Sequence, residues 1–154
     1  MEIGRLTEAD LPALAGLYKQ FWGEESRLER MQATFRRLKD DPDYIFLAAR
    51  SDSGLLGSVM GVVCEELYGG CIPFMVVEDV ILDRDRRREG IGSALMCELE
   101  KYAVERNCGY ILFVTESERT DAQRFYESLG YKPDAYRGFK KRLAKQGFEA
   151  PSCP

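Results

Sequence analysis

Apolar positions recur along this chain with a helical period in some stretches and as short continuous runs in others, and these two patterns predict its elements. Glycine, proline and clustered acidic residues separate the stretches and mark turns. In order, the predicted elements are a strand at residues 2–6, helices at 7–23 and 24–39, strands at 44–50, 55–64 and 74–82, a helix at 90–106, a strand at 110–115, a helix at 120–129 and a last strand within 131–143.

Size and composition are typical of one soluble globular domain. The 154 residues allow a proper core, and 45% hydrophobic and 31% charged residues are ordinary proportions. The net charge of −4 argues against non-specific nucleic-acid binding as the main task. The sequence has neither an apolar run of about 18 residues nor a charged-then-apolar leader, so we expect no membrane span and no signal peptide.

Five cysteines and the absence of histidine restrict the chemistry. The cysteine number is odd and no Cys-x-x-Cys pair occurs, so we expect reduced thiols in a cytoplasmic protein. The lack of histidine excludes Ser-His-Asp and Cys-His nucleophilic arrangements and most catalytic zinc sites, and we expect no metal. A general base must then be a carboxylate, a tyrosine, a lysine, a cysteine or water.

The stretch 87–93 carries the strongest chemical signal. Gly90 and Gly92 lie between a predicted strand and a predicted helix, so backbone N–H groups meet the positive end of a helix dipole and can bind phosphate oxygens. Arginines just before the glycines add positive charge. The turn is no Walker loop, because no Gly-Lys-Ser/Thr follows, and no dinucleotide fingerprint, because Leu95 replaces the third glycine.

Two separated stretches resemble the motifs of one enzyme family. Residues 80–92 look like an apolar strand followed by Arg/Gln-x-x-Gly-x-Gly/Ala, with Arg87, Gly90 and Gly92 at the defining positions. Residues 122–131 resemble the block Ala-x-x-Phe-Tyr-x-x-x-Gly-Phe/Tyr. Both motifs belong to the GNAT superfamily, the Gcn5-related N-acetyltransferases, and the order of predicted elements agrees with that family over roughly residues 1–143.

The resemblance implies a fold and a domain organisation. The expected class is α/β (mixed α+β), with a central mixed, mostly antiparallel sheet of six to seven strands and about four helices on its two faces. We expect one domain over residues 1–143, followed by a C-terminal tail at 144–154. The family splays the strand at 74–82 from its neighbour, which leaves backbone groups for a pantetheine arm.

The resemblance also implies acetyl-CoA, or another acyl-CoA, as co-substrate. N–H groups of the glycine turn would hold the CoA pyrophosphate, and the preceding strand would run beside the pantetheine arm. The residues assigned to the cofactor are Val80, Ile81, Leu82, Arg87, Arg88, Glu89, Gly90, Ile91, Gly92, Ser93 and Phe125. Many members carry an asparagine where this chain has Arg119, so a CoA hydrogen bond from that side chain is not implied.

Tyr126 is the predicted general acid. The family's tyrosine at this position lies near the CoA sulfur, and a phenol with an ordinary pKa of about 10 suits protonation of a departing thiolate. The alternative for Tyr126 is that it only packs in the core beside Phe125.

Glu78 and Asp79 are acids in the middle of an apolar strand, where strict alternation predicts opposite faces. Burying either one without a partner is costly, and pairing with an arginine is the structural alternative. The run Glu78-Asp79-Val80 resembles glucosamine-6-phosphate and diamine acetyltransferases, whose acidic pair lies at the acceptor site. This resemblance implies that Glu78 removes the proton from an ammonium acceptor.

The combined prediction is an acyl-CoA-dependent N-acyltransferase. It transfers acetyl to the primary amine of a small molecule (an amine, polyamine or amino sugar), which attacks directly in a ternary complex. Candidate acceptor-binding residues are Glu78, Asp79 and Glu24. Two alternatives stay open: a protein N-terminal or lysine acetyltransferase, and a non-catalytic acyl-CoA sensor. We expect no nucleic-acid or membrane partner; a homodimer is common in the family, although the sequence specifies no interface.

Overall fold

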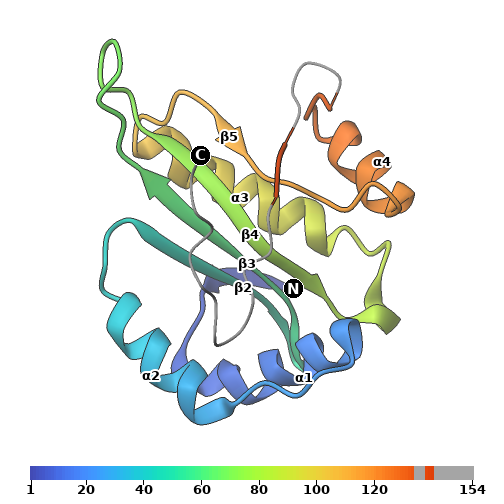
Figure 1. The fold of residues 1–154 in the computed structure, drawn as a ribbon. Helices are drawn as coiled ribbons and strands as arrows, with labels where there is room; N and C mark the ends of the chain where they lie inside the picture. Colours follow the sequence, from blue (N-terminus) through green and yellow to red (C-terminus); the bar gives the residue numbers. More distant parts are fainter. Residues whose placement is uncertain (134–137, 141–154) are drawn as a thin grey trace, which may run out of the picture. The chain divides into compact units, whose positions relative to one another are not determined.

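A computed structural model describes residues 1–133 and 138–140, and the chain forms two compact units, Met1–Phe113 and Val114–Pro154 (Figure 1). The elements of the first unit are β1 (Glu2–Arg5), the 3-10 turn η1 (Glu8–Asp10), α1 (Leu11–Trp22), α2 (Leu28–Leu38), β2 (Tyr44–Ser51), β3 (Gly54–Cys64), β4 (Phe74–Leu82), the 3-10 turn η2 (Arg84–Arg86), α3 (Ile91–Glu105) and β5 (Ile111–Leu112). The second unit contributes α4 (Thr120–Ser128).

The strands of the first unit form one sheet in the order β1-β2-β3-β4-β5. Neighbours are antiparallel except β4 and β5, which run parallel. The predicted class, a mixed and mostly antiparallel sheet with helices, is confirmed. The described residues supply five strands rather than six or seven, because the last predicted strand falls partly, and the predicted tail wholly, outside them.

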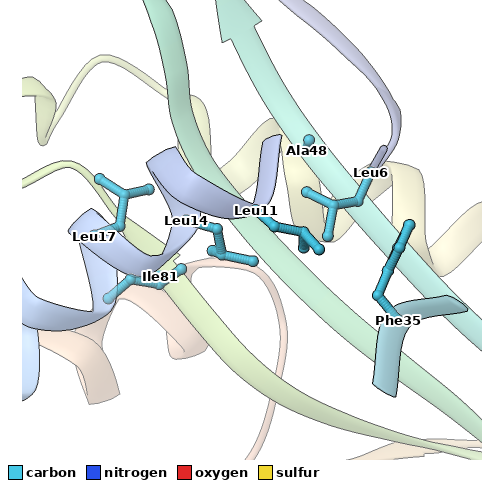
Figure 2. Close-up of a cluster of buried hydrophobic side chains, with 7 residues drawn as sticks. All are labelled: Leu6, Leu11, Leu14, Leu17, Phe35, Ala48 and Ile81. Carbon is cyan, nitrogen blue, oxygen red and sulfur yellow. The ribbon is translucent and has the colours of Figure 1, made fainter. Parts of the chain in front are cut away.

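One face of the sheet packs against α1 and α2 (Figure 1). The leucines of α1 recur at helical spacing, which places all three on the buried side of the helix. They form a buried cluster with side chains from α2 and the sheet; its members are Leu6, Leu11, Leu14, Leu17, Phe35, Ala48 and Ile81 (Figure 2). Each buried leucine contributes roughly 1.5–3 kcal/mol. This cluster therefore holds α1 on the sheet.

The opposite face of the sheet packs against α3. A Cβ atom added at Gly61 of β3 would lie 2.8 Å from Leu99 Cδ1 and 3.0 Å from Met75 Sδ, so α3 approaches the sheet closely there. Leu95, Met96 and Leu99 of α3 are fully buried. The glycine in β3 therefore makes room for a helix.

A β-bulge in β4 changes which faces its side chains occupy. Ser58 of β3 pairs with Ile81, but Met60 pairs with Glu78, so Asp79 and Val80 together oppose one residue. Asp79 adopts a left-handed φ of 53° at this point. As a result Met75 lies near α3 whereas Ile81 lies in the cluster with α1, although strict alternation would place both on one face.

Helix α2 begins later than predicted. Gly23 ends α1 in the left-handed conformation (φ 75°), and Arg27 before α2 is extended. The predicted start at Glu24 is therefore wrong, because residues 24–27 form a connection instead. The predicted strand at 110–115 is also shorter, since only Ile111 and Leu112 pair with β4. The predicted bounds of β4 are confirmed.

Candidate functional site

The glycine turn opens α3 with backbone donors that the helix itself leaves unbonded. Gly90 is the N-cap residue with a left-handed φ of 78°, and nothing lies within 4 Å of a Cβ added there, so conformation rather than space requires glycine. The first intrahelical bond runs from Ala94 N to Gly90 O. The N–H groups of Ile91, Gly92 and Ser93 thus have no intrahelical partner and suit an anion.

The arginines around this turn divide into two groups. The Arg84 guanidinium donates to Gln20 O, and Arg86 forms a bidentate ion pair with Glu89 at 2.8 to 3.0 Å. The Arg86 guanidinium lowers the pKa of Glu89, whose carboxylate is engaged in this pair. Arg87 and Arg88 are exposed, and the described part of the chain gives them no ion pair. They are therefore the two arginines of the turn whose charge is available to a ligand.

The edge of β4 that leads into this turn is open. β5 pairs with β4 only at Met75 and Val76, so within the described residues β4 has no strand partner on this side from Val77 onward. The side chain of Ile81 is buried in the cluster with α1, which leaves its backbone as the part that can meet a ligand. This geometry agrees with the splay expected from the resemblance.

A pocket of about 470 Å³ lies on the α1 and α2 side of the sheet. Its walls are mostly apolar, and the residues that line it are Leu6, Leu11, Leu14, Tyr18, Ser26, Arg27, Arg30, Met31, Thr34, Phe35, Leu38, Phe46, Ser58, Met60 and Asp79. Because Glu78 pairs with Met60, both side chains project to the pocket face of the sheet. The bulge therefore places both acids of β4 on one face, and the predicted opposite orientation is wrong.

Asp79 has a partner that the sequence did not indicate. Its carboxylate accepts a hydrogen bond from the hydroxyl of Tyr18 in α1. Loss of hydration beside the pocket raises the pKa of Asp79, and the Tyr18 hydrogen bond partly offsets this. Burial, followed by the nearby Asp79 charge, raises the pKa of Tyr18. A phenol, not an arginine, thus pairs with Asp79. In the sequence, Tyr18 only continues the helical spacing of the leucines of α1, a pattern typical of packing residues.

Glu24 lies apart from the pocket lining. It is exposed in the connection between α1 and α2, whereas Ser26 and Arg27 of the same connection line the pocket. Its neighbour Glu25 forms an ion pair with Lys19 at 2.6 Å. Of the three predicted acceptor-binding acids, only Glu78 and Asp79 come together.

The second unit contains the block that includes Tyr126. The Tyr126 ring packs against Phe125 at 5.0 Å and against Tyr131 at 6.3 Å between centroids. Burial raises the pKa of Tyr126, and the charge of Arg119 opposes this rise. Gly130 follows the helix with a left-handed φ of 93°, as expected for a helix C-terminus.

Within residues 1–133 and 138–140, no helix is both long and apolar enough to cross a bilayer. The same residues contain no group of three or more cysteine and carboxylate side chains arranged to hold a metal ion.

Comparisons with known proteins agree with the fold. The sequence profile of the acetyltransferase (GNAT) family matches residues 11–131. The chain therefore belongs to this family, and its fold is that of an N-acetyltransferase.

The similar proteins include curated sequences and solved structures. An acetyltransferase of Pectobacterium atrosepticum is 32% identical over 97 residues, which span 63% of each chain, so the match covers just under two thirds of this relative. A putative acetyltransferase of Agrobacterium tumefaciens shares the fold with a TM-score of 0.85 at 21% identity, covering 93% of this chain and 100% of that one. AAC(6')-Iy in complex with the bisubstrate analogue CoA-S-monomethyl-acetylneamine gives a TM-score of 0.75 at 19% identity, with 93% and 98% coverage.

Proposed function

We propose that this protein transfers the acetyl group of acetyl-CoA to the primary amine of a small molecule. The observation that carries the proposal is the open edge of β4, which leads directly into the N–H groups of the α3 N-terminus. On the adjoining face, the same strand carries Asp79, which lines the pocket, and Glu78, which pairs with the pocket residue Met60. Family membership supports acetyl transfer as the chemistry.

The residues around the turn fit a CoA ligand. The N–H groups of Ile91, Gly92 and Ser93 suit a pyrophosphate, with Arg87 and Arg88 adding charge of the right sign. Unpaired backbone groups from Val80 to Leu82 suit the amides of a pantetheine arm. When bound, acetyl-CoA supplies an acetyl group activated as a thioester.

In the proposed reaction, residues of this chain accept one proton and donate another. An ammonium acceptor must lose a proton before its nitrogen can attack, and Glu78 on the pocket face is the proposed acceptor of that proton. Asp79, beside Glu78 and lining the pocket, is the proposed anchor for the ammonium. Tyr126 is the proposed donor to the departing thiolate, and its raised pKa keeps the phenol protonated at neutral pH.

The size of the pocket supports a small acceptor. About 470 Å³ lies within the range of ordinary small-molecule sites, and the pocket is mostly apolar with few polar groups. A protein N-terminus or lysine side chain, and a sensor that binds acyl-CoA without turnover, are the competing functions that the experiment must separate.

The test combines donor binding with turnover. Acetyl-CoA at about 100 times its Kd should stabilise the protein by roughly 2.7 kcal/mol, seen as a rise in Tm. Release of free thiol is then followed with a panel of small amines and with peptides. No stabilisation would refute the cofactor assignment, turnover with peptides alone would refute the small acceptor, and binding without turnover would favour a sensor.

Three variants assign the roles. Glu78→Gln should lower kcat by about a hundredfold or more, because general-base catalysis is lost. Tyr126→Phe should lower kcat while leaving the Tm shift with acetyl-CoA unchanged. Glu105→Gln, an exposed acid on α3, is the matched control and should change neither. An unaltered rate in Glu78→Gln or Tyr126→Phe would remove that residue from the mechanism.

A further inference from the structure

Arg27 and Arg30 lie at the wrong end of α2 for helix stability. Arg27 is the N-cap residue and Arg30 is in the first turn, where the helix dipole favours acidic side chains and opposes cations. Glu29 is the single acid of that turn. Within the described part of the chain, neither arginine side chain has a recorded ion pair or hydrogen bond. Local stability therefore does not account for these two charges.

Both arginines line the pocket, and two other polar residues of its wall, Ser58 and Asp79, have partners of their own. The Ser58 hydroxyl donates to Leu47 O at 2.8 Å. Asp79 accepts from Tyr18 and is the one acid among the lining residues. The pocket thus has an apolar body, two unpaired cations supplied by α2 and a carboxylate supplied by β4.

Resting on the proposed function, we infer that the acceptor carries an anionic group in addition to its amine, joined by an apolar skeleton. Arg27 and Arg30 bind the anion, for which guanidinium groups are suited by their fork of donors. Asp79 holds the amine at the sheet. A polyamine fits this arrangement poorly, because its second ammonium would meet the two arginines.

The anion is a carboxylate or a phosphate, and paired acceptors distinguish the two. Leucine and isopentylamine share one skeleton and differ by the carboxylate, whereas aminoethyl phosphate and ethanolamine differ by the phosphate. The measured quantity is the ratio of kcat/KM within each pair, compared between the wild type and its variants so that differences in amine basicity cancel. The pair whose ratio changes identifies the anion.

Charge reversal is the decisive perturbation. Arg27→Glu and Arg30→Glu should each lower one of these ratios by about tenfold or more, because a charge-assisted contact is replaced by repulsion. Both residues are exposed, so folding should be retained. Arg37→Glu, on the same helix but outside the pocket lining, is the matched control and should leave both ratios unchanged. Equal ratios in all four proteins would overturn the inference.

A binding assay separates this inference from the proposed function. 4-Methylpentanoate has the apolar chain and the carboxylate but no amine, so it reports the anion site without turnover. Its binding, followed by NMR chemical-shift changes, should be lost in Arg27→Glu and Arg30→Glu and kept in Arg37→Glu. Absence of thiol release with every amine would refute the proposed function; equal affinity of this acid for all four proteins, with no effect on the phosphate pair, would refute the anion site.

Discussion

Asp10→Asn removes the ion pair between Asp10 and Arg50, which is the most buried ion pair among the described residues. Asp10 ends the η1 turn and accepts from Arg50 Nε at 2.8 Å and from the Thr7 N–H and hydroxyl, each at 2.7 Å. Its side chain is 12% exposed and that of Arg50 is 27% exposed. Because η1 leads directly into α1, this pair fixes the start of the helix that forms one wall of the pocket.

The expected loss follows from the titration of Asp10. Hydrogen bonding by Arg50, opposed by burial and assisted by Thr7, lowers the pKa of Asp10 from 3.8 to about 2. A difference of one pKa unit corresponds to about 1.4 kcal/mol, so the interactions of the Asp10 carboxylate with Arg50 and Thr7 together contribute about 2 kcal/mol to the free energy of unfolding. The pKa of Asp10 is lower in the folded state than in the unfolded state. This contribution to stability is therefore present at pH values above 3.8 and is lost as the pH falls from 3.8 towards 2.

Urea denaturation at a series of pH values measures this contribution. Asp10→Asn should be less stable than the wild type near neutral pH, and the difference should shrink as the pH falls below 3.8. Glu8→Gln is the matched control. Glu8 lies in the same turn as Asp10 and pairs with Arg36 of α2, but that pair is exposed, so its loss should change the free energy of unfolding little. A difference for Asp10→Asn that does not change with pH would refute the electrostatic reasoning.

Further predictions concern packing and backbone conformation, and for each one the free energy of unfolding is measured by urea denaturation. Leu99→Ala should cost about 2–5 kcal/mol, because it leaves a cavity where α3 meets the sheet. Gly57→Ala should cost about 1–3 kcal/mol and weaken acetyl-CoA binding, because its Cβ would lie 2.8 Å from Ile81 O and displace β4. Gly23→Ala should cost about 1 kcal/mol through its left-handed φ of 75° alone, with nothing within 4 Å to clash, and should leave acetyl-CoA binding intact. Stability equal to the wild type in any of these variants would contradict the corresponding reason.

Local signals in the sequence were enough to predict the glycine turn that opens α3. Gly90 and Gly92 combine a turn that needs glycine with a helix N-terminus, and both properties depend on residues within a few positions of each other. The bounds of β4 and the Gly130 helix end were predictable for the same reason. The family motifs are short because the geometry that they encode is local.

The residues that come together at the pocket could not be predicted from local signals. Alternation predicted opposite faces for Glu78 and Asp79, and the bulge that overrides it shows only in the register between β3 and β4. Tyr18 lies far from Asp79 along the chain and carries the same helical spacing as its packing neighbours. No sequence pattern distinguishes Arg27 and Arg30 from other charged residues, although both line the pocket.

The sequence by itself determined the order of elements, the glycine turn before α3 and the family, since each depends on local propensity or on a contiguous motif. Only the tertiary structure decided which side chains share the pocket beside α1 and α2. The physical reason is that α1, α2, β3 and β4 meet there through contacts between residues distant in the chain. A one-residue bulge then brings Asp79 into the lining of that pocket, on the same face of the sheet as Glu78.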